Sequence, residues 1–223
     1  MQRVIQHIYI IPLLISMLLS LKSFRLKWPA PYKTFSVLLV CISIVEIIAI
    51  LWKYFLYDKV GDGHFSNNNA WIYNCFLIPQ YLLYMYVYYQ TFKSKFLKRT
   101  ITAAGIFFAL FTIANILFFQ SIHTINSLPL IMAGIIMFFL NISYFEQLIR
   151  EKEIIRLMGH PMVWISFGVF FQVATLPYMT SLNYLIRNNI SLAVTLYYVY
   201  LGVNCVIYTL YSIAFLCRNP IHK

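Results

Sequence analysis

The stretch TFSVLLVCISIVEIIAILWKYFL, residues 34 to 56, is an apolar run of membrane-spanning length with one carboxyl group, Glu46, near its middle. An α-helix rises about 1.5 Å per residue, so about 20 apolar residues cross a hydrocarbon core of roughly 30 Å. The run predicts a transmembrane helix that carries Glu46 to the centre of the bilayer. An acid at that depth costs about 2.5 to 3.5 kcal/mol on insertion scales, so we expect it to face other helices and to find hydrogen-bond partners there. The sequence leaves open whether this carboxyl is charged.

The composition of the whole chain is that of an integral membrane protein, with 61% hydrophobic and 10% charged residues. Predicted spans use almost all of the 223 residues, which leaves no room for a soluble catalytic domain. A net charge of +11 lies in loops that flank the spans, so we expect no nucleic-acid partner. The four cysteines form no C-x-x-C pair, and we predict neither a metal site nor a cofactor.

The apolar segments predict an all-α fold, a seven-transmembrane helix bundle that forms a single membrane domain over residues 1–223. The fifth helix is predicted to project beyond the membrane, because FEQLIREKEIIRLM (145–158) keeps a helical pattern after the apolar run ends. The predicted helices cover about 4–21, 34–56, 70–92, 100–119, 128–157, 161–180 and 190–216.

Basic residues orient this predicted bundle, because loops on the cytoplasmic side of membrane proteins are rich in Lys and Arg. With the N-terminus outside and the C-terminus cytoplasmic, most of the 17 basic residues fall on the inner side. The exceptions are Arg3, Lys53, Lys59 and Arg187. Tryptophans at both predicted boundaries agree with this orientation, since Trp residues favour the interface between membrane and water.

Polar residues inside the predicted spans are the candidates for a site. Counting along each helix places several of them at nearly the same depth, and a polar side chain that faced lipid would lack partners, so we expect them to converge on the bundle interior. They could be interhelical contacts worth roughly 0.6 to 2 kcal/mol each. Alternatively, they form a ligand site open to the outside, with Glu46 as charge anchor or proton carrier. The candidate ligand-binding residues are Glu46, Asn74, Gln80, Tyr84, Asn141, Gln172 and Asn204.

Three phrases carry a resemblance to known proteins: Val45-Glu46-Ile47-Ile48, Trp71-Ile72-Tyr73-Asn74, and the segment from Asn204 to Cys217. In these short motifs and in the order of its predicted helices, the chain resembles uncharacterised small seven-helix integral membrane proteins of Bacteroidetes, over nearly its whole length. That resemblance implies a bacterial inner membrane and adds no activity. Retinal binding is not expected, because residues 190–216 contain no lysine for a Schiff base.

Three functions follow from these patterns. In the first, the protein is a receptor-like or sensory module whose polar pocket around Glu46 binds a small molecule, while the basic inner loops contact a cytoplasmic signalling partner. In the second, it is a small-molecule or proton-coupled transporter, although no internal repeat is visible and many carriers show one. In the third, it is a membrane scaffold held together by its polar residues. No pair of nucleophile and base stands out, so we predict no catalytic residues and no enzyme.

Overall fold

The computed structural model describes residues 7–56, 69–150 and 159–217, and these residues are almost entirely helical. No strand occurs in these three ranges, so the all-α prediction is confirmed. The helices are α2 (Ile10–Ser20), the short α3 (Lys22–Arg25), α4 (Ala30–Leu51) with the π-helical turn η1 (Trp52–Leu56), α6 (Ala70–Thr91), α7 (Lys95–Phe118), α8 (Ser127–Arg150), α9 (Pro161–Asn188) and α10 (Ile190–Leu216).

Five helices of the described chain are long and apolar enough to cross a membrane, which makes this a multi-pass membrane protein. α2 has only 11 residues, about 16 Å of helix, and is too short to span the core alone. α6 has 22 residues, six of them tyrosines between Tyr73 and Tyr89, and is not among the five helices that are apolar enough. Seven spans therefore stay a prediction. The five are Ala30–Tyr54, Lys95–Phe118, Ser127–Arg150, Pro161–Leu182 and Ile190–Leu216.

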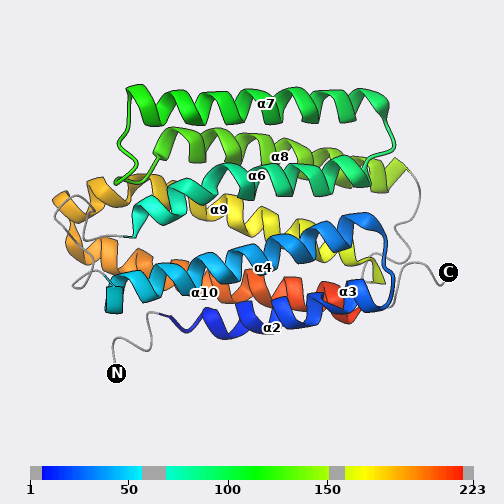
Figure 1. The fold of residues 1–223 in the computed structure, drawn as a ribbon, viewed down its shortest axis with the longest axis horizontal. Helices are drawn as coiled ribbons and strands as arrows, with labels where there is room; N and C mark the ends of the chain where they lie inside the picture. Colours follow the sequence, from blue (N-terminus) through cyan, green and yellow to red (C-terminus); the bar gives the residue numbers. More distant parts are fainter. Residues whose placement is uncertain (1–6, 57–68, 151–158, 218–223) are drawn as a thin grey trace.

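Six of the helices pack side by side into a closed ring (Figure 1). Around this ring, α4 packs on α6, α6 on α8, α8 on α9, α9 on α10, α10 on α2, and α2 on α4. α7 lies outside the ring, against α6 and α8. The ring therefore encloses an interior that side chains from all of its helices can reach.

Two helices begin earlier than the sequence pattern predicted. α4 starts at Ala30 rather than at 34, because Pro29 and Pro31 suit the start of a helix instead of preventing it. α7 starts at Lys95 rather than at 100, because the Ser94 side chain accepts a hydrogen bond from the backbone N–H of Leu97. Both starts are set by local capping chemistry and not by hydrophobicity.

Other boundaries also differ from the prediction. α2 begins at Ile10 after a turn at residues 7–9, and residues 4–6 of the predicted helix lie outside the described residues. α9 continues to Asn188 instead of ending near 180, with Pro177 inside the helix. The hydroxyl of Thr180 bonds to the backbone oxygen of Leu176, 3.0 Å away, close to that proline. The predicted extension of the fifth helix over 151–157 lies outside the described residues.

Aromatic side chains fill one half of the ring interior, near the start of α4 and the end of α10. We call Trp28, Phe35, Tyr211 and Phe215 the aromatic plug; all four are fully buried. The ring centroids of Phe35 and Tyr211 are 4.8 Å apart, and those of Trp28 and Phe215 are 5.7 Å apart. Offset and edge-to-face contacts at these distances are favourable for aromatic pairs, so the plug is a firmly packed part of the core.

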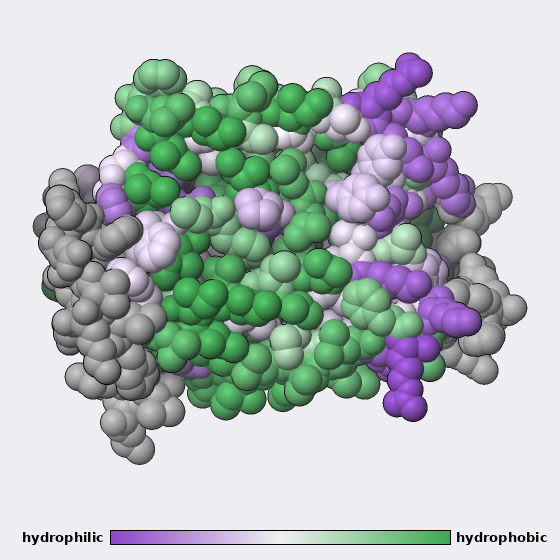
Figure 2. Space-filling model, viewed as in Figure 1, coloured by the Kyte–Doolittle hydropathy of each residue, from purple (hydrophilic) through white to green (hydrophobic). Residues whose placement is uncertain are grey.

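The face of the molecule in Figure 2 has an apolar belt and, at one end, a hydrophilic region. Figure 2 shows hydrophobic side chains over the middle of the molecule and hydrophilic ones gathered at the end where α6 finishes and α7 begins. An exposed apolar belt of this extent suits contact with lipid. We call the hydrophilic end the basic end; its described cations include Lys22, Arg25, Lys93, Lys95, Lys98 and Arg99.

Candidate functional site

A cavity of about 500 Å³ occupies the half of the ring interior opposite the basic end. We call the end of the cavity furthest from the basic end its mouth; it lies near the end of α4 and the start of α6, where Lys53, Asn69 and Thr124 line it. Its floor is formed by Tyr84 and Tyr211 in the middle of the bundle. The volume falls within the range of roughly 300 to 1,000 Å³ that small-molecule sites occupy.

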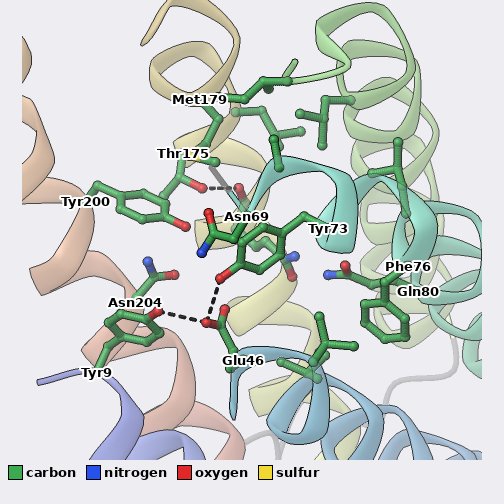
Figure 3. Close-up of a pocket in the computed structure, with 18 of the residues that line it drawn as sticks. Tyr9, Glu46, Asn69, Tyr73, Phe76, Gln80, Thr175, Met179, Tyr200 and Asn204 are labelled. Carbon is green, nitrogen blue, oxygen red and sulfur yellow. Dashed lines mark hydrogen bonds between the residues drawn. The ribbon is translucent and has the colours of Figure 1, made fainter. Parts of the chain in front are cut away.

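The carboxyl group of Glu46 lies on the wall of this cavity, held by tyrosines from two other parts of the chain (Figure 3). The hydroxyl of Tyr9, just before α2, donates to Oε2 of Glu46 at 2.8 Å. The hydroxyl of Tyr73, on α6, donates to the same oxygen at 2.9 Å. Glu46 therefore faces the bundle interior and has the partners that a buried acid requires.

The second carboxyl oxygen of Glu46 and the amide of Gln80 are two polar groups of the wall that have no hydrogen-bond partner among the described residues. Neither Oε1 of Glu46 nor the Gln80 side chain hydrogen-bonds to a residue in the described ranges, and both residues are half-buried because they border the cavity. Figure 3 shows the Gln80 side chain among those that line the cavity, near Phe76. Structural polar groups in a membrane core are normally paired, so these two groups are available to a ligand.

The cavity contains six of the seven candidate residues. Asn204 projects from α10, with 8% of its surface exposed, and Gln172 from α9 accepts a long hydrogen bond from the Tyr211 hydroxyl at 3.5 Å. Tyr84 and Tyr211 bring their hydroxyls to within 3.3 Å of each other at the floor. The six residues that line the cavity are Glu46, Asn74, Gln80, Tyr84, Gln172 and Asn204.

Asn74 borders the cavity, but its amide nitrogen is used for structure. It donates to the backbone oxygens of Ile122 and Thr124, both at 2.6 Å. These two bonds fix the connection between α7 and α8 against the start of α6. Asn74 therefore shapes the mouth of the cavity rather than offering its amide N–H groups to a ligand.

Asn141, the seventh candidate, lies outside the cavity lining. It is 1% exposed and accepts a hydrogen bond from the Tyr88 hydroxyl at 2.7 Å, while its own amide donates to the backbone oxygen of Met137 at 2.9 Å. The Tyr88 hydroxyl also lies 3.2 Å from the hydroxyl of Ser166. These contacts join α6, α8 and α9, which is the interhelical role that the sequence left open for such residues.

Apart from Tyr84, the tyrosines of the cavity were the part of the site that sequence reasoning missed. Tyr9 and Tyr73, the partners of Glu46, were not selected, although Tyr73, Gln80 and Tyr84 recur at helical spacing on one face of α6. The clearest available signal was a polar aromatic stripe with spacings of three and four along the last helix. Its members, all on the cavity wall, are Tyr197, Tyr200, Asn204, Tyr208 and Tyr211.

The mouth carries the cationic and imidazole groups of the cavity. Lys53 lies near the end of the helix that bears Glu46, and its Nζ is 5.5 Å from the centre of the Tyr54 ring. His7 places its Nε2 3.1 Å from the Tyr54 hydroxyl. Within the described ranges, no group of three or more His, Cys, Asp or Glu side chains is arranged to hold a metal ion.

Comparison of the chain with protein-family models, curated proteins and solved structures finds no match in any of the three. The carboxyl, the amides and the tyrosines of the cavity are therefore the basis for a functional proposal.

Proposed function

We propose that the protein is a receptor-like membrane protein that binds a small organic molecule in the cavity around Glu46. The observation that carries the proposal is a carboxyl held by two tyrosine hydroxyls through one oxygen, on the wall of a cavity of about 500 Å³. Few large concave sites occur in a protein, and one with convergent polar groups is the expected place for a ligand. An intramembrane acid likewise favours a functional role.

The proposed orientation places the basic end in the cytoplasm and the mouth of the cavity outside. This assignment follows from the excess of Lys and Arg on the cytoplasmic side of membrane proteins. Together with the resemblance to small Bacteroidetes membrane proteins, it favours the inner membrane of a bacterium. The basic end would then contact the cytoplasmic signalling partner, which completes a receptor-like arrangement of ligand on one side and partner on the other.

A transporter is the second candidate, and the prolines beside the cavity favour it. Pro79 lies inside α6, next to Gln80, and Pro177 lies inside α9, next to Leu176 of the cavity wall. Prolines in membrane helices free backbone groups and are common where helices bend. A transporter must also open toward the basic end, where the aromatic plug now closes the cavity floor at Tyr211.

A scaffold without a ligand is the third candidate, supported by the structural roles of Asn74 and Asn141. It accounts less well for Gln80, whose amide bonds no described residue although it lies within the bundle. A purely structural amide at that position would be expected to have a helix partner.

Ligand screening by thermal stability tests the proposal. Purified protein in lipid nanodiscs would be heated with a collection of small metabolites, and the hits repeated with Glu46→Gln, Gln80→Ala and the control Lys98→Ala at the basic end. We expect hits that stabilise the wild type and Lys98→Ala but have lost most of their effect on the two cavity variants. Equal stabilisation of all four proteins, or no stabilising compound, would contradict the proposal. Flux of the same compound into proteoliposomes would favour the transporter over the receptor.

A further inference from the structure

We infer that the ligand of this cavity is an organic monocation, an amine or ammonium group on a small organic body. The inference rests on the proposed function and names the ligand class for the same site. Three observations support the inference: Oε1 of Glu46 has no hydrogen-bond donor among the described residues, tyrosine rings surround the Glu46 carboxyl, and the cationic side chains lie away from it.

The Oε1 atom of Glu46 is suited to accept a hydrogen bond from a cationic donor. Both tyrosine hydroxyls, from Tyr9 and Tyr73, donate to Oε2 and fix the orientation of the carboxyl group. Oε1 receives no hydrogen bond from any residue that the structure describes. Hydrogen bonds between an ammonium group and a carboxyl oxygen are among the strongest in proteins. An N–H donor on the ligand would therefore give Oε1 of Glu46 the hydrogen bond that the described residues do not provide.

The protein does not itself supply a countercharge to Glu46 within the described ranges. The one ion pair there joins Arg150 to Glu146 on α8, one helical turn apart and exposed. Among the described residues, Lys53 is the only lysine or arginine of the cavity lining, and it lies at the mouth, seven residues beyond Glu46 on the same helix. The described residues thus give the deep part of the cavity one acid and no lysine or arginine.

Tyrosine rings are the second feature of the deep cavity, where they lie among aliphatic side chains such as Leu77 and Ile207. Figure 3 shows Tyr9, Tyr73 and Tyr200 around the Glu46 carboxyl, from three different segments of the chain. Several tyrosines of the cavity wall are held in place by packing against one another. The ring centroids of Tyr200 and Tyr178 are 5.5 Å apart, and those of Tyr81 and Tyr84 are 6.1 Å apart. The face of an aromatic ring attracts a cation through its quadrupole, and aromatic cages recognise quaternary ammonium ligands in this way.

Other ligand classes fit this wall less well. An anion would meet the carboxyl and the electron-rich ring faces together, and both interactions oppose it. A neutral molecule would fill the volume but leave Glu46 without a charged partner in a medium of low dielectric. Gln80 and Asn204 add hydrogen-bonding groups that can accept from or donate to the polar body of a cationic ligand.

A matched set of three small probes tests the ligand class. Benzylammonium, benzyl alcohol and benzoate share one aromatic skeleton and differ in charge. Their binding to the full-length protein in nanodiscs would be measured by titration calorimetry, with empty nanodiscs as the blank. We expect benzylammonium to bind at least tenfold more tightly than benzyl alcohol and benzoate not to bind. Glu46→Gln should weaken benzylammonium at least tenfold and leave benzyl alcohol unchanged.

The outcomes separate the ligand class from the proposed function. Tightest binding of benzoate or of benzyl alcohol would overturn the monocation and leave a small-molecule site standing. Absence of saturable binding for all three would count against both. If Glu46→Gln does not fold, Tyr200→Leu removes one ring face instead, and Tyr198→Leu is its control, because Tyr198 lies on the same helix outside the cavity lining and is 48% exposed. We expect a loss of benzylammonium affinity for Tyr200→Leu alone; equal affinities in the two variants would contradict the inference.

Discussion

Gly168 on α9 lies so close to the ring of Tyr211 on α10 that an added Cβ would come within 2.3 Å of ring carbon Cε1. This close approach lets Tyr211 reach both Phe35 in the aromatic plug and Tyr84 at the cavity floor. We predict that Gly168→Ala displaces the Tyr211 ring and lowers the free energy of unfolding by about 1 to 3 kcal/mol, the usual cost of overpacking. The midpoint of thermal unfolding of the purified protein measures the effect.

Gly202→Ala is the matched control for this prediction. Gly202 also lies inside a long helix, but nothing approaches within 4 Å of the position of its added Cβ. Since alanine favours helix by up to about 1 kcal/mol over glycine, the Gly202 variant should unfold at the same temperature as the wild type or higher. Equal losses in both variants would show that the contact with Tyr211 has no special effect.

The two tyrosine donors to Glu46 should act together. Removing either hydroxyl, by Tyr9→Phe or Tyr73→Phe, is expected to cost about 1 kcal/mol, because Oε2 keeps its other donor. The double variant should lose more than the sum, by about 0.5 kcal/mol or more, since the carboxyl then has no donor among the described residues. Chemical unfolding of the four proteins in one detergent measures this coupling.

Tyr86→Phe serves as the control for the tyrosine pair. Tyr86 lies on the same helix as Tyr73, is 49% exposed and does not line the cavity. Its variant should be as stable as the wild type. Strict additivity of Tyr9→Phe and Tyr73→Phe would mean that the two hydroxyls do not share one acceptor.

The two amide residues Asn141 and Gln80 should affect different properties. Asn141→Ala leaves the buried hydroxyl of Tyr88 without its closest partner and is expected to cost about 1 to 2 kcal/mol of stability. Gln80→Ala breaks no hydrogen bond within the described ranges, so its stability should change by less than about 0.5 kcal/mol, while binding of a cavity ligand weakens. Thermal unfolding combined with ligand titration separates the two effects, and a large loss of stability in the Gln80 variant would assign it to structure instead.

Orientation in the membrane can be tested by labelling from outside intact cells. In a variant without the four native cysteines, Lys53→Cys marks the mouth of the cavity and Lys95→Cys marks the basic end; both lysines are exposed. With the basic end in the cytoplasm, an impermeant maleimide should label Cys at 53 in intact cells and Cys at 95 only after permeabilisation. The reverse pattern would invert the proposed topology.

Much of the fold could be predicted from the sequence, because apolar runs of membrane length determine where most helices lie. A single acid within such a run must also face other helices rather than lipid. Glu46 was expected to face other helices, and it does. The start of α7 and the end of α9 were less predictable, because a serine cap sets the first, a proline is tolerated before the second, and hydrophobicity reports neither.

The sequence could not distinguish Asn141 from the six candidates that line the cavity. Asn141 and Gln80 are both amides at a similar predicted depth, yet one is paired with Tyr88 and the other borders the cavity. That difference depends on which helices are neighbours in the ring. The contact of Tyr9 with Glu46 could not be predicted either. Tyr9 lies just before α2, and the packing of α2 against α4 brings it to Glu46.

Cysteine labelling inside α6 tests most directly whether a cavity opens to the end opposite the basic end. Gln80→Cys lies on the cavity wall, and Val87→Cys lies seven residues further along the same helix, 1% exposed and outside the lining. Both would be made in the variant without native cysteines and treated from outside the cell with a small, charged, impermeant methanethiosulfonate. We predict that the cysteine at 80 reacts and the cysteine at 87 does not. A protein in which neither position reacts, or in which both react at the same rate, would contradict an open cavity around Glu46.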